Sequence, residues 1–136
     1  MCRHRFTRRL DQRGVAAIEF AIVLPVLLLI AFGLIDFGRA VWSQTTLDYA
    51  AQATARCLAI GSTACSSATT YAQAHAYGVT LSNVTPTTIA SGGTACGQTS
   101  SVAGEQVVAK MAFNYIFPAF SSFSSGTFSA CGFYPT

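Results

Sequence analysis

The sequence predicts an α+β fold, in which a long N-terminal membrane-spanning helix continues into a small domain with a second helix and a short antiparallel sheet. Three observations lead to this prediction. Residues 15–35 form an apolar run with one charged side chain, residues 47–58 repeat apolar and small residues at helical spacing, and residues 107–115 carry an apolar residue at every second position. Helical periodicity followed by strand alternation is typical of the α+β class.

The charge distribution indicates a membrane protein rather than a soluble enzyme. The 136 residues suffice for one small domain, and 10% of them are charged, against about 25% in soluble domains. The first 13 residues hold five arginines and one aspartate, whereas the rest of the chain is nearly neutral. Because these arginines stand directly before the apolar run, we expect them to contact anionic membrane lipid, and we expect no nucleic-acid partner.

Residues 15–35 are expected to span a membrane as a single helix. About 20 apolar residues cross a ~30 Å hydrocarbon core, and this run has 21. The positive-inside rule places the N-terminus in the cytoplasm and residues 36–136 on the other side. The alternative is a secretory signal peptide that is cut after the run, for which Ala31-Phe32-Gly33 offers a weak cleavage site.

A second processing signal lies at the start of the run, where Gly14 closes the basic segment and Glu19-Phe20 follow. A carboxylate at the centre of a membrane helix costs on the order of 2–3 kcal/mol, and less near the interface, so its presence indicates a function. Cleavage after Gly14 would make Val15 a free α-amine one helical turn from Glu19. We expect Glu19 either to pair with such an amine during assembly or to be recognised by a peptidase; an inert interfacial charge is the alternative.

These residues resemble a known signal. Gly14 followed by Val-Ala-Ala-Ile-Glu-Phe resembles the class III signal of type IV pilins, which is cut before the apolar segment. With Leu24-Pro25 and Asp36-Phe37-Gly38, the chain is more closely similar to the TadE-like pseudopilins of the Tad (tight adherence)/Flp pilus system. The resemblance covers about residues 13–60.

The resemblance implies a pilin-like domain organisation and a set of partners. Residues 1–14 would be a basic leader removed by a prepilin peptidase, and residues 15–35 the transmembrane and assembly helix. Residues 36–136 would be an extracytoplasmic TadE-like domain, with a helix extension over 36–60 and a small α+β part over 61–136. The implied partners are a major pilin, other pseudopilins and the assembly platform in the bacterial inner membrane.

The long helix is expected to run from Val15 to Ile60, where Gly61 would end it. One face carries small and apolar residues suited to close packing: Leu47, Ala50, Ala51, Thr54, Cys57 and Leu58. Pro25 removes one backbone hydrogen bond inside this helix. The resemblance implies a bent or melted helix there, and a kink that the membrane helix tolerates is the alternative.

A second helix is expected after Ser66 or Ser67, running to about Tyr77 and ended by Gly78. A strand is expected from Val79 to Thr85.

Pro86 would end that strand, and a turn is expected at residues 91–93. A strand over residues 107–115 would be ended by Pro118. Several phenylalanines near the C-terminus are expected to anchor a strand in the core, with an exposed loop as the alternative: Phe117, Phe120, Phe123, Phe128 and Phe133.

Four cysteines lie outside the apolar run, in a compartment that permits disulfides: Cys57, Cys65, Cys96 and Cys131. They allow three pairings. Cys57–Cys65 is the closest pair in sequence and would join the long helix to the second helix, which leaves Cys96–Cys131 to fasten the C-terminal segment to a loop. Cys2 is expected to be unpaired and removed with the leader. A zinc site is the alternative, although no CxxC motif is present.

No group of residues indicates catalysis or a cofactor. The outer domain has one histidine, His75, and after Asp48 one carboxylate, Glu105, too few for a paired-carboxylate site. The GxxxxGK and HExxH motifs are absent from the sequence.

We therefore expect a structural protein without enzymatic activity, cofactor or metal. After prepilin peptidase cleavage it would take part in the assembly or initiation of a Tad-type adhesive pilus, which is a repeating, non-closing assembly. The alternatives are a single-pass membrane-anchored domain or a secreted domain, either of which would bind a surface and have no pilus role.

Overall fold

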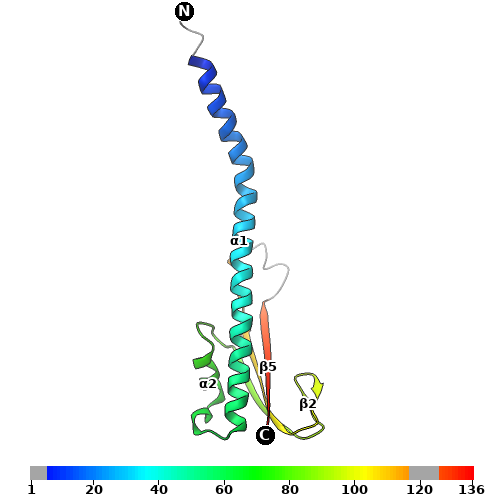
Figure 1. Cartoon of the computed structure of the whole chain (residues 1–136). Coiled ribbons are helices and arrows are strands. Elements are labelled where there is room, and N and C mark those ends of the chain that lie inside the picture. The colour runs from blue at the N-terminus through cyan, green and yellow to red at the C-terminus, as the bar shows by residue number, and fades with distance from the viewer. Residues whose placement is uncertain (1–5, 117–125) are drawn as a thin grey trace, which may run out of the picture. The chain divides into compact units, whose positions relative to one another are not determined.

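The computed structural model describes residues 6–116 and 126–136, and the side chains of the first segment from Gly14 onward (Figure 1). The contacts divide the chain into two compact units, Met1–Phe37 and Gly38–Thr136. The elements in chain order are α1 (Phe6–Ala59), the 3-10 helix η1 (Thr63–Cys65), α2 (Ala68–His75), β1 (Asn83–Ile89), β2 (Thr94–Ala95), β3 (Gln98–Thr99), β4 (Gly104–Ala112) and β5 (Thr127–Pro135). The α+β class expected from the sequence is confirmed.

Helix α1 has 54 residues and begins earlier than expected. The expected start at Val15 was wrong, since the helix begins at Phe6, inside the basic segment. Gly14 does not interrupt it, because a single glycine costs a helix only about 1 kcal/mol relative to alanine. Pro25 lies inside α1, which is helical on both sides of it.

The C-terminal end of α1 is closed by a Schellman motif at Gly61. Gly61 has a φ of +69°, a left-handed conformation that glycine adopts without strain. Its N–H donates to the Leu58 carbonyl at 2.9 Å, and the Ser62 N–H donates to the Cys57 carbonyl at 3.3 Å. The Cys57 and Leu58 carbonyls of the last turn are thereby satisfied, and the expected stop at Gly61 is confirmed.

Helix α2 begins where a serine cap was expected. The Ser67 side chain accepts a hydrogen bond from the Thr70 N–H at 3.4 Å, which places Ser67 at the N-cap. The helix ends at His75, two residues before the expected Tyr77, and Gly78 follows with a φ of +79°.

Three strands form an antiparallel sheet in the order β1-β4-β5, and β2 pairs with β3 in a separate hairpin. The alternation of burial expected over residues 107–115 is confirmed: Val107, Ala109, Met111 and Phe113 are buried, and Tyr115 is half-buried. The expected bounds of the strand were wrong, since β4 runs from Gly104 to Ala112 and ends before Phe113. Pro118, Phe117, Phe120 and Phe123 lie outside the described residues. Phe128 lies in β5 and packs against the core, whereas Phe133 in the same strand is half-buried.

The expectation for the first strand was wrong in its position and in the role of Pro86. The strand runs from Asn83 to Ile89, and Pro86 lies within it, opposite Val107. In the order β1-β4-β5, β1 has one partner strand, so it is an edge strand. Proline is tolerated at an edge because its missing N–H need not leave a gap in the hydrogen-bond ladder.

The core lies between the last turns of α1 and the sheet. Figure 1 shows this part of α1, coloured cyan to green, with α2 and β5 on either side. The main cluster joins small residues of α1 to the inner face of β4 and β5, and includes Leu47, Ala50, Ala51, Ala109, Met111 and Ala130. A second cluster joins Ala55 of α1 to Ala72 of α2, Val84 of β1 and Val107 of β4. The packing face expected at residues 47–58 is therefore the face that α1 buries.

Two disulfides fasten this unit. Cys57 is bonded to Cys65 with a Cα–Cα distance of 6.1 Å, and Cys96 to Cys131 with a Cα–Cα distance of 5.6 Å. These are the two pairs favoured from the sequence. The first joins the end of α1 to η1, and the second holds the β2–β3 hairpin to β5. Cys2 lies outside the described residues.

Removal of either disulfide is expected to destabilise the unit, and the second more than the first. The bonds close loops with sequence separations of 8 and 35 residues, for which the chain-entropy relation gives about 2.5 and about 4 kcal/mol. Urea unfolding of the full chain in micelles, followed by circular dichroism, would compare Cys57→Ala/Cys65→Ala with Cys96→Ala/Cys131→Ala. Cys2→Ala serves as the control and should unfold as the parent does. A double variant that unfolds like the parent would contradict the pairing.

Candidate assembly and processing site

The N-terminal part of α1 is exposed and apolar around its circumference. Within the described residues, one helical stretch, Gly14–Ala59, is long and apolar enough to cross a membrane. The chain itself buries none of the most apolar part of that stretch. Exposed apolar residues follow one another from Val15 to Phe37, with Ile22 at 69% and Phe20 at 64% exposure. An apolar surface of this extent requires lipid or other helices to cover it.

Gly14 has no structural reason to be glycine in this helix. Apart from its chain neighbours and the backbone of its own helix turn, no described atom lies within 4 Å of the position that a Cβ on Gly14 would occupy, and the Gly14 φ is outside the left-handed region. Neither close packing nor backbone geometry therefore requires the residue. Because glycine also weakens a helix interior, its presence between Arg13 and the apolar run favours a role outside the fold.

Glu19 and Phe20 lie on the exposed surface of α1. Glu19 is four residues after Val15, so the two side chains lie on the same face, one turn apart. Within the described part of the chain, Glu19 makes no hydrogen bond or ion pair. The structure thus presents a carboxylate among apolar side chains, available to a partner outside the described residues. Pro25 lies further along the same exposed segment.

The other expected site residues are the cysteines, and the structure brings all four into the Gly38–Thr136 unit. They belong to the fold rather than to the exposed segment. No group of three or more histidine, cysteine, aspartate or glutamate side chains suited to a metal was found among the described residues.

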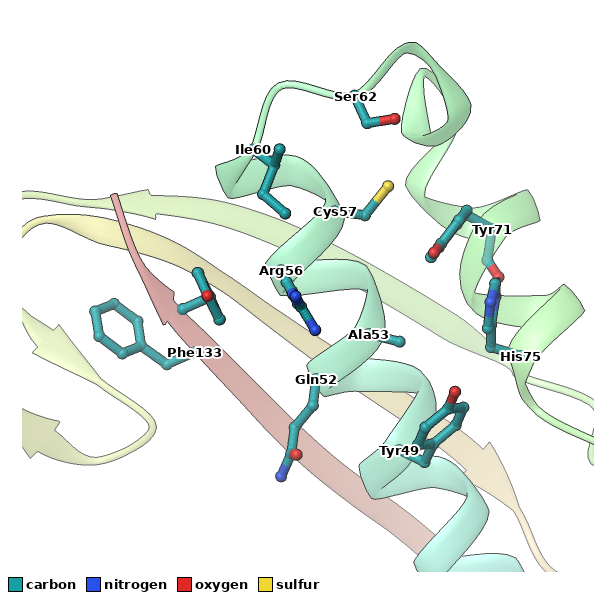
Figure 2. A pocket seen from close by; sticks show the side chains of 11 residues that line it. Tyr49, Gln52, Ala53, Arg56, Cys57, Ile60, Ser62, Tyr71, His75 and Phe133 are labelled. Carbon is teal, nitrogen blue, oxygen red and sulfur yellow. The ribbon is translucent and has the colours of Figure 1, made fainter.

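The sequence reasoning missed an open groove on the opposite face of α1 from the core (Figure 2). Its floor is α1, from which Tyr49, Gln52, Arg56 and Ile60 contribute. These residues follow the spacing i, i+3, i+7, i+11, the same periodicity that identified the buried face. The sequence could have indicated this second face of α1 through that periodicity. The walls come from α2 and β5, which only the tertiary fold brings together.

The exposed segment lies within a match to a protein family. The family model of TadE-like proteins matches residues 14–56, about a third of the chain. The match begins at Gly14 and ends at Arg56, one turn before the end of α1, so it spans the exposed apolar helix and most of the buried face. Over these residues the chain is similar to TadE-like proteins, as the sequence indicated. Neither the curated proteins nor the solved structures gave a match.

Proposed function

We propose that this protein is a minor pilin or pseudopilin that takes part in the assembly or initiation of a Tad-type adhesive pilus. A prepilin peptidase removes residues 1–14, and the mature helix stays in the bacterial inner membrane until it enters, initiates or caps the pilus. The N-terminus faces the cytoplasm, and the Gly38–Thr136 unit lies in the periplasm or outside the cell. The role is structural and not enzymatic.

The observation that carries this proposal is the exposed apolar stretch of α1, which begins at Gly14, the first residue of the family match. An apolar surface on all sides fits lipid tails and fits a bundle of similar helices about equally well, because lipid tails are as apolar as leucine side chains. A helix of this kind can therefore leave the bilayer for a filament without losing its apolar cover. A helix that only anchored a domain would stay in the bilayer and would not need to replace lipid contacts with helix contacts.

The exposed apolar helix also suggests which partners the protein has. The exposed helix would pack against a major pilin and other pseudopilins, through contacts that repeat without closing. The prepilin peptidase and the assembly platform would act on the chain while it is in the membrane. The unpaired Glu19 would meet the new α-amine of Val15, in its own chain or in a neighbouring subunit.

The alternative functions are a membrane-anchored and a secreted surface-binding domain. N-terminal sequencing of the protein purified from its own cells separates the three. A chain that begins at Val15 supports the pilin proposal, whereas Met1 or Cys2 would indicate an anchored domain. A start beyond Gly33 would indicate secretion after ordinary signal peptidase cleavage.

Gly14→Val is expected to block removal of the leader, because a peptidase that cuts after glycine has little room for a branched side chain. The substitution leaves the fold intact, since nothing lies within 4 Å of the new Cβ. Immunoblots of cell membranes would show the full-length chain accumulating. Gly38→Val is the matched control, since Gly38 lies in the same helix and is equally open. Normal leader loss in Gly14→Val would refute the cleavage site.

A further inference from the structure

The groove on the outer face of α1 has the size and lining of a ligand site, and the proposed pilus role does not use it. Its volume is about 750 Å³, within the ~300–1,000 Å³ typical of small-ligand sites. Figure 2 shows α1 along the floor, with Tyr71 and His75 of α2 on one side and Phe133 of β5 on the other. The groove lies within the Gly38–Thr136 unit.

Aromatic rings form the α2 side of the groove. The rings of Tyr71 and His75 are stacked with their centroids 4.2 Å apart, and the Tyr49 ring lies 6.3 Å from His75. His75 Nδ1 lies 2.9 Å from the Tyr71 carbonyl oxygen, which accepts, so Nδ1 must carry the proton. This bond fixes the imidazole against Tyr71 and leaves Nε2 for another partner. The result is a preformed aromatic surface with polar edges.

Arg56 supplies a positive charge at the β5 side. Its guanidinium lies 6.0 Å from the centroid of the Tyr134 ring, a cation–π contact that orients it without neutralising it. No carboxylate lines the groove, and within the described residues Arg56 makes no ion pair. A guanidinium in this state presents paired N–H donors that match a carboxylate in bidentate geometry.

We propose that this groove binds an acidic saccharide, with the sugar carboxylate on Arg56 and the sugar rings on the aromatic side chains. A pyranose ring has an apolar C–H face that stacks on aromatic rings, and hydroxyl groups around its edge that require hydrogen-bond partners. Tyr49, Tyr71 and His75 supply the rings, while Gln52 and Ser62 supply an amide and a hydroxyl. Ile60 is the one large aliphatic side chain in the lining. That composition favours a sugar over an acidic peptide, whose apolar side chains need aliphatic pockets.

Calorimetric titration of the full chain in phosphatidylcholine nanodiscs, which contain no sugar-headed detergent, tests this site. The probes are trigalacturonate, its methyl ester and triglutamate. Trigalacturonate is expected to bind, and the ester, which keeps the rings but lacks the charge, is expected to bind at least about tenfold more weakly. Arg56→Gln should weaken trigalacturonate binding by a similar factor, and Tyr71→Leu should weaken it as well.

Lys110→Gln is the matched control, because it removes an exposed cation from β4, outside the groove. It should bind trigalacturonate as the parent does. Equal binding of triglutamate would replace the saccharide with an acidic peptide and overturn the proposal. Unchanged binding by Arg56→Gln, or no binding of trigalacturonate, would overturn it too. None of these outcomes depends on whether the chain enters a pilus.

Discussion

Gly132→Val is expected to destabilise the Gly38–Thr136 unit by at least about 3 kcal/mol, at the upper end of the range for overpacked cores. Gly132 lies in β5, where the strand crosses α1. A Cβ on this residue would lie 2.5 Å from the carbonyl carbon and oxygen of Ala51 and 2.6 Å from the backbone nitrogen of Gln52. These are backbone atoms of a helix, so they cannot rotate away as a flexible side chain would.

The valine variant can fold only if α1 moves away from the sheet, which opens the contacts of Leu47, Ala50 and Ala51 with β4 and β5. Small domains are stable by only about 5–15 kcal/mol in total, so this loss is a large fraction. Urea unfolding of the full chain in micelles would measure it. Gly132→Ala, which adds the Cβ alone, should show a smaller loss.

Gly38→Val is the control for the same substitution in open space, and it should unfold at the same urea concentration as the parent. A Gly132→Val chain with an unchanged transition would show that β5 does not approach α1 this closely.

The close approach of β5 to α1 at Gly132 is a tertiary contact that could not be predicted from the sequence. The spacing of Leu47, Ala50, Ala51 and Thr54 predicted which face of α1 is buried, because a helical face is a local property of the sequence. It did not predict which element covers that face. The partner, β5, mixes small, polar and aromatic residues. Its inward set, Phe128, Ala130 and Gly132, is distinguishable only after the strand register is known.

Pro86 was misplaced for a related reason. Locally, proline ends a strand, and the sequence contains no sign that this strand would lie at an edge. Edge position is set by the order β1-β4-β5, which joins residues far apart in the chain. The groove around Arg56 was missed because its walls come from α2 and β5. Each of these elements contributes two residues to the groove, too few to form a recognisable sequence pattern.

The exposed apolar helix over residues 15–35 was predicted correctly from sequence, whereas the roles of Gly14 and Glu19 in processing and assembly stay predictions. Gly14, Glu19 and the run that follows are contiguous, and their meaning depends on charge, hydropathy and length rather than on tertiary contacts. The structure adds that Gly14 serves no packing role and that Glu19 is exposed. Gly14 is therefore not explained by packing, and Glu19 is not explained by a contact within the described residues. Both findings support the proposed roles in cleavage and assembly.

Glu19→Gln is expected to yield a chain that is inserted in the membrane and cut after Gly14, yet fails to support pilus formation. Glutamine keeps the size and hydrogen-bonding capacity of glutamate but removes the charge. The charge is needed after cleavage, when the Val15 amine exists to meet it in apolar surroundings. Leaving one member of such a buried pair without its partner costs about 3–5 kcal/mol, which corresponds to more than a hundredfold in an assembly equilibrium.

Electron microscopy would count pili on the mutant cells, and N-terminal sequencing of the membrane-bound chain would establish cleavage. Glu105→Gln is the matched control: it makes the same substitution in β4, where Glu105 accepts a hydrogen bond from the Thr88 hydroxyl at 2.8 Å. It should leave pilus number unchanged. Glu19→Asp keeps the charge on a shorter side chain and should restore part of the pilus number.

The outcomes separate the three roles considered for Glu19. Cleaved chains without pili would support the assembly contact, because maturation would then have proceeded without the charge. Uncut chains would assign Glu19 to recognition by the peptidase. Cleaved chains with parental pilus numbers would make Glu19 an inert interfacial charge, and the ion pair with the Val15 amine would have to be abandoned.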